Sequence, residues 1–409
     1  MFLDTQLKNP SPEGVSKNHF SSGSDLAPQL AAMNALALRS LADLFSEKEK
    51  LFLRSVTLRD NRVYREQSSP KRTIIALLGL NRLVDPSMNR MFDIRSMHEA
   101  VFCDTSWVKS LRELGLLTWF TAECAPERLG KLFKEFEFDK ALGSYQDGRE
   151  AHTSGLAWFL AGISHSRLAD SGKVPDLTDL AVDTYHLLIE NQGEGGIFGQ
   201  VAFPRWYRWD LYRRLGTFGD QIYAIYALST FARAFHIEEP LAPALSCGHA
   251  IRALQGENGE WWFLYDKQMD RVVNRYPIFS WQQDGTAPVG LLALGEATGQ
   301  SFLEPIRKGL SWSTRSTEFR NTTELQAHRQ GLSWDSVHPK SRTIKYCEAA
   351  LSLLNISRKP QEKPLCVRYA TRPDHFGWML YAFGRIGLPK EPSIAGAMRA
   401  KSRRGKRLG

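Results

Sequence analysis

Three aspartates in the sequence stand where apolar helices are expected to begin. Asp220 lies in the segment GTFGDQ, Asp284 in WQQDGTAP and Asp374 in RPDHFG, where His375 follows it directly. Carboxylate and imidazole groups can exchange protons with a substrate, so these four residues are the candidate catalytic residues. Aspartate is also a favoured helix N-cap, and capping alone would explain each aspartate.

Aromatic and basic residues crowd the segments that precede two of these aspartates. Aromatic faces can stack on sugar rings or stabilise a cation, and arginines can bind a carboxylate, sulfate or phosphate group. Burial in a core would explain the aromatic residues equally well. The residues that we predict to bind substrate are Trp206, Tyr207, Arg208, Trp209, Arg213, Arg214, Trp262, Tyr265, Tyr276 and Trp281.

Several common kinds of site are missing from the sequence. It contains no GxGxxG, GxxxxGK[ST], HExxH or GxSxG motif, and its ten histidines show no metal-ligand spacing. We therefore expect no cofactor and no metal ion. The five cysteines form no CxxC pair, which argues against a disulfide framework and predicts a reducing, cytoplasmic setting.

Two kinds of helical segment alternate along the chain. Six segments are rich in small apolar residues around most of the helix, which predicts burial on most sides. They span 73–80, 111–120, 154–163, 220–235, 285–297 and 375–386. More amphipathic segments lie at 36–50, 129–138, 177–190, 243–254, 302–310 and 343–354.

This alternation predicts an all-α fold, an (α/α)6-type toroid with an inner ring of helices inside an outer ring. An α-solenoid of stacked helix pairs is the alternative. A small β-hairpin insertion is expected near residues 260–280. In a toroid the inner helices all begin at one end, so the three aspartates would meet in a concave site there, within reach of Arg72.

The charge of the chain is concentrated at its C-terminal end. The net charge of the 409 residues is +9, and six of these charges lie in the tail 399–409. The remainder is close to neutral, which argues against a specific nucleic-acid partner. We predict a flexible leader 1–28, one toroid domain 29–398, and a disordered basic tail that contacts anionic surfaces weakly at most.

The sequence also argues against insertion in, or passage across, a membrane. No stretch approaches the roughly 18 uninterrupted apolar residues that a membrane-spanning helix needs. The first thirty residues are polar and contain no apolar segment typical of a secretory signal. We therefore expect neither a membrane span nor secretion.

One short segment occurs twice. NQGEGGIFG runs from Asn191 to Gly199, and LQGENGEWW runs from Leu254 to Trp262. Each follows an amphipathic helix and reads Gln-Gly-Glu-x-Gly-x-aromatic. Self-similarity at a spacing of this order is typical of repeated supersecondary units. We predict that Gln192 and Gln255 occupy equivalent positions, each linking one helical hairpin to the next.

The second copy, Gln255-x-x-x-Gly259-x-Trp261, resembles the QW repeat of the terpenoid cyclases and protein prenyltransferases. The resemblance covers two repeats, roughly residues 175 to 300. It implies an α/α toroid and a terpene-cyclase-like reaction, an acid-initiated cyclisation or isomerisation with Asp284 as the proton donor. The DxDD motif of the class II cyclases is absent. We also find no zinc-ligand set like that of the prenyltransferases.

Three functions therefore remain open. The repeat favours the terpene-cyclase-like enzyme. The charged loops favour a carbohydrate-active enzyme, a hydrolase, lyase or epimerase acting on acidic saccharides, with Asp220 and Asp284 as base and acid. The third is a non-catalytic toroid that binds a partner, in which every carboxylate would be a helix cap. The expected partner is a small molecule or an oligosaccharide.

Overall fold

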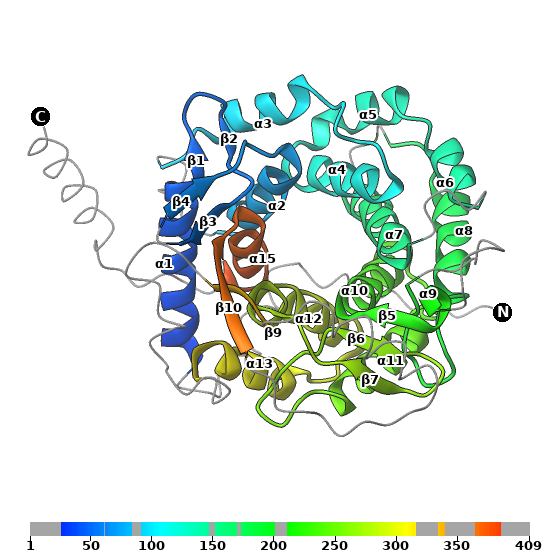
Figure 1. Cartoon of the computed structure of the whole chain (residues 1–409). Helices are drawn as coiled ribbons and strands as arrows, with labels where there is room; N and C mark the ends of the chain where they lie inside the picture. Colours follow the sequence, from blue (N-terminus) through cyan, green and yellow to red (C-terminus); the bar gives the residue numbers. More distant parts are fainter. Residues whose placement is uncertain are drawn as a thin grey trace, which may run out of the picture.

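The computed structural model describes residues 26–60, 62–83, 91–146, 152–169, 172, 174–200, 211–315, 334–339 and 365–385. Within them, six helices form a closed inner ring, seen nearly end-on in Figure 1. Each packs against the next along the chain, and the last packs against the first. These helices are α2 (Pro70–Leu80), α4 (Leu111–Cys124), α7 (Thr153–Leu168), α10 (Phe218–Phe235), α12 (Ala287–Thr298) and α15 (Pro373–Phe383).

Outer helices alternate with the inner ones along the chain and surround them (Figure 1). They are α1 (Leu26–Leu44), α3 (Ile94–Cys103), α5 (Leu129–Glu135), α6 (Phe138–Gln146), α8 (Thr178–Ile189), α11 (Leu241–Ala253) and α13 (Leu303–Arg315), with the 3-10 turn η2 (Pro126–Arg128) before α5. The predicted toroid is confirmed. The solenoid alternative is wrong because the ring closes between α15 and α2.

The predicted helices differ from the observed ones in a few places. The outer helix expected at 36–50 ends at Leu44, where β1 (Phe45–Ser46) and β2 (Leu51–Phe52) form a small antiparallel pair. Helix α3 was not predicted. The segment 343–354, most of the leader 1–28, and the tail 399–409 lie outside the described residues.

An antiparallel five-stranded sheet lies beside the ring and was also not predicted. Its strand order is β4-β3-β10-β9-β8. The strands are β3 (Val56–Arg59), β4 (Arg62–Arg65), β8 (Ile278–Phe279), β9 (Trp334–Pro339) and β10 (Leu365–Thr371). Because β10 leads directly into α15, its pairing with β3 and β9 fixes where α15 begins.

A second sheet contains the predicted hairpin insertion. Strands β6 (Leu264–Asp266) and β7 (Arg271–Asn274) form the hairpin, and β5 (Leu215–Thr217) pairs with β6. The turn between β6 and β7 ends at Asp270, whose φ of 44° is left-handed. Because β5 precedes α10 directly, this sheet fixes the start of α10.

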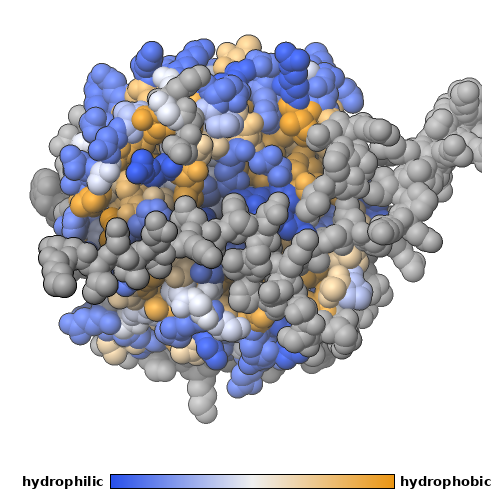
Figure 2. Space-filling model, turned by 180° about the vertical axis from the view of Figure 1, so that it is seen from behind, coloured by the Kyte–Doolittle hydropathy of each residue, from blue (hydrophilic) through white to orange (hydrophobic). Residues whose placement is uncertain are grey.

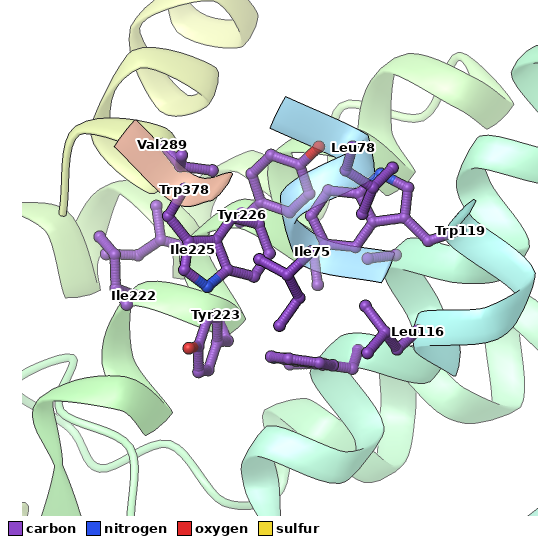
Figure 3. Packing of buried hydrophobic residues seen from close by; sticks show 14 of the residues in the cluster. Ile75, Leu78, Leu116, Trp119, Ile222, Tyr223, Ile225, Tyr226, Val289 and Trp378 are labelled. Atoms are coloured by element: carbon purple, nitrogen blue, oxygen red, sulfur yellow. The ribbon is translucent and has the colours of Figure 1, made fainter. Parts of the chain in front are cut away.

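Glycines let the inner helices approach closely. A Cβ atom on Gly79 of α2 would collide with the backbone of Gly377 in α15. A Cβ atom on Gly162 of α7 would collide with the backbone of Gly115 in α4. The aromatic side chains inside the ring are packed as tightly: Trp119 stacks on Tyr226 with ring centres 4.7 Å apart (Figure 3).

The two copies of the repeated segment occupy equivalent positions. The Gln192 side-chain amide donates to a glycine carbonyl of its own loop at 2.9 Å and to Pro243 O of the next outer helix at 2.8 Å. Gln255 donates to the corresponding glycine at 3.0 Å and to Pro305 O at 2.9 Å. Each glutamine therefore joins successive outer helices, as predicted.

The aromatic residue of each copy is held by a further glutamine at the start of the following inner segment. Phe198 and Gln221 exchange two hydrogen bonds of 2.7 and 2.8 Å, from Phe198 N–H to the amide oxygen and from the amide nitrogen to Phe198 O. Trp261 and Gln283 exchange the same pair at 3.0 and 3.2 Å. The repeat thus ties outer helices to the starts of inner ones.

Seen from behind, hydrophobic and hydrophilic residues are interspersed over the described part of the surface (Figure 2). Among the described helices, none is both long and apolar enough to cross a membrane.

Candidate functional site

The inner helices all begin at one end of the ring, which we call the mouth. Tyr223, in the second turn of α10, is close enough to Asp220, Asp374 and Arg372 for their charges to act on its phenol. Asp284 contacts His375 directly. The mouth therefore brings together the three aspartates and the histidine that the sequence singled out.

Asp284 and His375 form a buried pair. Nε2 of His375 lies 2.8 Å from Oδ1 of Asp284, and their side chains are only 6% and 10% exposed. Asp284 lies within a π-helical turn, η3 (Gln282–Thr286), and its carboxylate caps neither this turn nor α12. Capping therefore does not explain Asp284. Gly285 brings the turn against Trp378 of α15, on the same helix as His375.

Asp374 is bound by two arginines. Its carboxylate accepts from Arg72 Nη1 at 2.8 Å and from Arg372 Nη2 at 2.6 Å. Burial by itself would raise the pKa of Asp374, but the Arg372 and Arg72 guanidiniums hold this pKa at about 2. Asp374 therefore stays ionised at neutral pH. The N-cap position of α15 belongs to Arg372.

Arg372 links this ion pair to the five-stranded sheet. Its Nη1 lies 3.1 Å from Oδ1 of Asp335 on β9, a side chain only 3% exposed. Its guanidinium carbon lies 5.5 Å from the ring centre of Trp281. Trp281 thus stays at the mouth, where we predicted it. Asp335 was missed because its place depends on the pairing of strands far apart in the sequence.

Asp220 is part of a helix cap and is also buried. Its Oδ2 accepts from the Thr217 backbone N–H at 2.8 Å and from the Thr217 hydroxyl at 2.6 Å, which completes a capping box for α10. Burial raises the pKa of Asp220 above its ordinary value even though these bonds favour the anion. Asp220 therefore takes up a proton more readily than an exposed aspartate.

Sequence reasoning missed three residues that lie at the mouth within the inner helices. They are Arg112 of α4, Trp158 of α7 and Tyr223 of α10. Burial raises the pKa of Tyr223 to about 12, so its phenol is neutral. All three residues lie in the first two turns of predicted inner helices, and this position is the sequence signal that indicates a place at the mouth.

Two of the predicted substrate-binding residues have other roles. Tyr265 of β6 is fully buried, as is the next residue Asp266, so its side chain is part of the core. Arg214 binds the buried carboxylate of Asp266 through two hydrogen bonds of 2.7 and 2.6 Å. Its charge is therefore neutralised within the second sheet.

The remaining predicted contacts divide into two groups. Arg213 is exposed on the short helix α9 (Leu211–Arg214), and Trp262 and Tyr276 contact each other beside Arg275, with ring centres 6.3 Å apart. These three stay predictions. Trp206, Tyr207, Arg208 and Trp209 lie outside the described residues. Among the described side chains, no group of three or more metal-binding residues is found.

Comparison with solved structures reveals the same architecture. A sugar epimerase from a ruminal bacterium matches with a TM-score of 0.57 and 12% identity, over 88% of this chain and 100% of that one. The cellobiose 2-epimerase of Bacillus thermoamylovorans matches with a TM-score of 0.57 and 11% identity, over 87% and 99%. A possible member of the GH105 family from Salmonella enterica matches with a TM-score of 0.54 and 12% identity, over 93% and 98%. The chain shares their fold.

No protein-family model matches the sequence, and no curated protein does. The toroid implied by the resemblance to the terpenoid cyclases is present. The three structures described above are sugar epimerases and a possible GH105 protein, so they give no support to the closer relationship.

Proposed function

We propose that this protein is a carbohydrate-active enzyme that moves protons at the mouth of its toroid, with an acidic saccharide as substrate. The observation that carries the proposal is the buried Asp284–His375 pair. A carboxylate at hydrogen-bond distance from one imidazole nitrogen holds the ring in one orientation. Such a histidine is suited to general acid–base catalysis.

The roles follow from the surroundings of each group. With Nε2–H of His375 donating to Asp284, the Nδ1 lone pair is the basic atom, able to take a proton from a sugar carbon or from water. Asp220, whose pKa is raised by burial, supplies the complementary acid. Asp374 is held ionised by two arginines, so it contributes a fixed negative charge at the mouth and does not donate a proton.

The similarity in fold to two sugar epimerases supports a saccharide as the substrate. The charged mouth supports it as well. Arg72, Arg372 and their carboxylate partners are suited to the hydroxyl and carboxylate groups of a saccharide and poorly suited to a hydrocarbon. The terpene-cyclase-like reaction has less support for this reason. A purely structural role also leaves Asp284 without an explanation.

The test is turnover on a panel of neutral and acidic oligosaccharides in D₂O, followed by NMR and mass spectrometry. The wild-type protein should transform at least one acidic member. His375→Gln should lose turnover by ~100-fold or more because the base is removed. The control His249→Gln changes an exposed histidine on α11 and should have wild-type activity. No turnover of any saccharide by the wild type, or full activity in His375→Gln, would contradict the proposal.

A further inference from the structure

Arg112 lies against two aromatic rings at the mouth. It is the second residue of α4, and its guanidinium carbon lies 4.4 Å from the ring centre of Trp158 and 5.7 Å from that of Tyr223. Trp158 and Tyr223 are 2% and 9% exposed. The rings fix the guanidinium by cation–π attraction and cover it on this side.

Within the described part of the chain, Arg112 makes no hydrogen bond and no ion pair, and its buried Nε–H has no acceptor. The neighbouring Glu113 is bound to Lys71 at 3.0 Å. By contrast, Arg72 and Arg372 both bind Asp374. A partly buried guanidinium with no carboxylate at hydrogen-bond distance among the described residues would be stabilised by a bound anion.

Arg112 also affects the pKa of Asp220, the proposed acid. The positive charge of Arg112 favours the anionic form of Asp220. An anion bound to Arg112 would cancel this effect and raise the pKa of Asp220 further. The binding of an acidic ligand would thereby favour the protonated, acid form of Asp220.

We infer that Arg112 binds the carboxylate of an acidic sugar, which makes it the residue that selects a uronate over a neutral sugar. This inference rests on the proposed function. The planar fork of a guanidinium matches a carboxylate through two parallel N–H···O bonds. The guanidinium carbon lies over the Trp158 ring, and this contact positions the group for such a pair. A lysine would provide the charge without this geometry.

The experiment measures binding by isothermal titration calorimetry. Oligogalacturonates and oligoglucuronates are compared with their carboxyl-reduced, neutral counterparts. The wild-type protein should bind an acidic member at least ~10-fold more tightly than its neutral counterpart. Arg112→Met should lose this preference, with ~10- to 100-fold weaker binding of the acidic member and unchanged binding of the neutral one. Arg112→Lys should recover only part of the preference.

The matched control is Arg307→Met, which changes an exposed arginine paired with Glu304 on α13 and should bind like the wild type. Circular dichroism checks that each variant folds. If Arg112→Met does not fold, the preference for acidic ligands is tested with Arg112→Lys. The inference is overturned if the wild type binds acidic and neutral members equally or binds neither. It is also overturned if a folded Arg112 variant retains the full preference. Turnover of neutral saccharides with no preference for acidic ones would overturn this inference and leave the proposed enzyme activity intact.

Discussion

At the scale of the residue, the mouth contains two aspartates whose surroundings shift their pKa values in opposite directions. Burial raises the pKa of Asp220. The pKa of Asp374 is held at about 2 by Arg372 and Arg72, against the effect of its burial. Two carboxylates with separated pKa values can serve as a proton donor and a fixed anion within one site. The sequence shows both residues but not this difference, because the arginines reach Asp374 only in the folded ring.

A prediction at this scale concerns Asp220→Asn. The amide oxygen can still accept from the Thr217 backbone N–H, so the cap and the melting temperature should change little. Turnover should fall by ~100-fold or more because the acid is removed. In the wild type, activity should decline as the pH rises past the raised pKa of Asp220.

The pH–rate profile and the melting temperature should be measured on the same preparations. Asp179→Asn, in the exposed first turn of α8, is the control and should match the wild type in both. An Asp220→Asn protein with wild-type turnover and an unchanged profile would leave Asp220 as a helix cap only.

At the scale of the element, burial decided what could be predicted. The six inner helices were found from their sequence because they are apolar on nearly every side. The five-stranded sheet was not found, because β10 pairs with β3 more than 300 residues away and its strands are short. Asp335 and the contacts of Arg372 depend on this sheet, so the ion pairs at the mouth could not be predicted. Aromatic composition likewise does not tell that Tyr265 is buried in the core.

The repeat makes a prediction about two elements at once. Gln192→Ala and Gln255→Ala each remove two hydrogen bonds to carbonyls, at equivalent positions. Each should lower the free energy of unfolding by about 1 to 2 kcal/mol, with similar values for both. Turnover should be unchanged because the printed partners of both glutamines are backbone carbonyls of their own loop and of the next outer helix, not the proposed acid or base.

Urea denaturation gives the free energies, and Gln268→Ala, at an exposed position after β6, is the control. Strongly different values for the two variants would contradict the structural equivalence. A loss of turnover at unchanged stability would place the glutamines in the site instead.

At the scale of the whole molecule, a largely buried network of polar groups joins the inner helices away from their starts at the mouth. Glu123 of α4 binds Arg82, which follows α2, at 2.8 Å, and it contacts His165 of α7 at 3.1 Å. Tyr381 of α15 donates to Glu123 at 2.5 Å. Tyr226 of α10 contacts both Tyr381 and His165 at 2.8 Å. The network thus joins the last turns of α4, α7 and α15 and the segment after α2 to the middle of α10.

The network makes folding sensitive to acid. Burial lowers the pKa of His165 to about 4, although Glu123 favours its cation. In the unfolded chain this histidine titrates near 6.5, so between these values the unfolded state binds more protons. Its contribution to stability is therefore complete above about pH 6.5 and is lost as the pH falls toward 4. The lowered pKa values of Glu123 and Asp374 act mainly below this range.

We therefore expect the melting temperature to fall as the pH is lowered from 7 to 4.5, and the fall to be smaller in His165→Gln. Glutamine does not titrate, yet it can still donate to Glu123 and accept from Tyr226. His98 is the matched control, since burial also lowers its pKa but it lies outside the network, on α3. If His165 carries the effect, His98→Gln should keep most of the acid sensitivity. Equal pH dependence in His165→Gln and the wild type would show that the network is stable to protonation and that the loss of stability arises elsewhere in the chain.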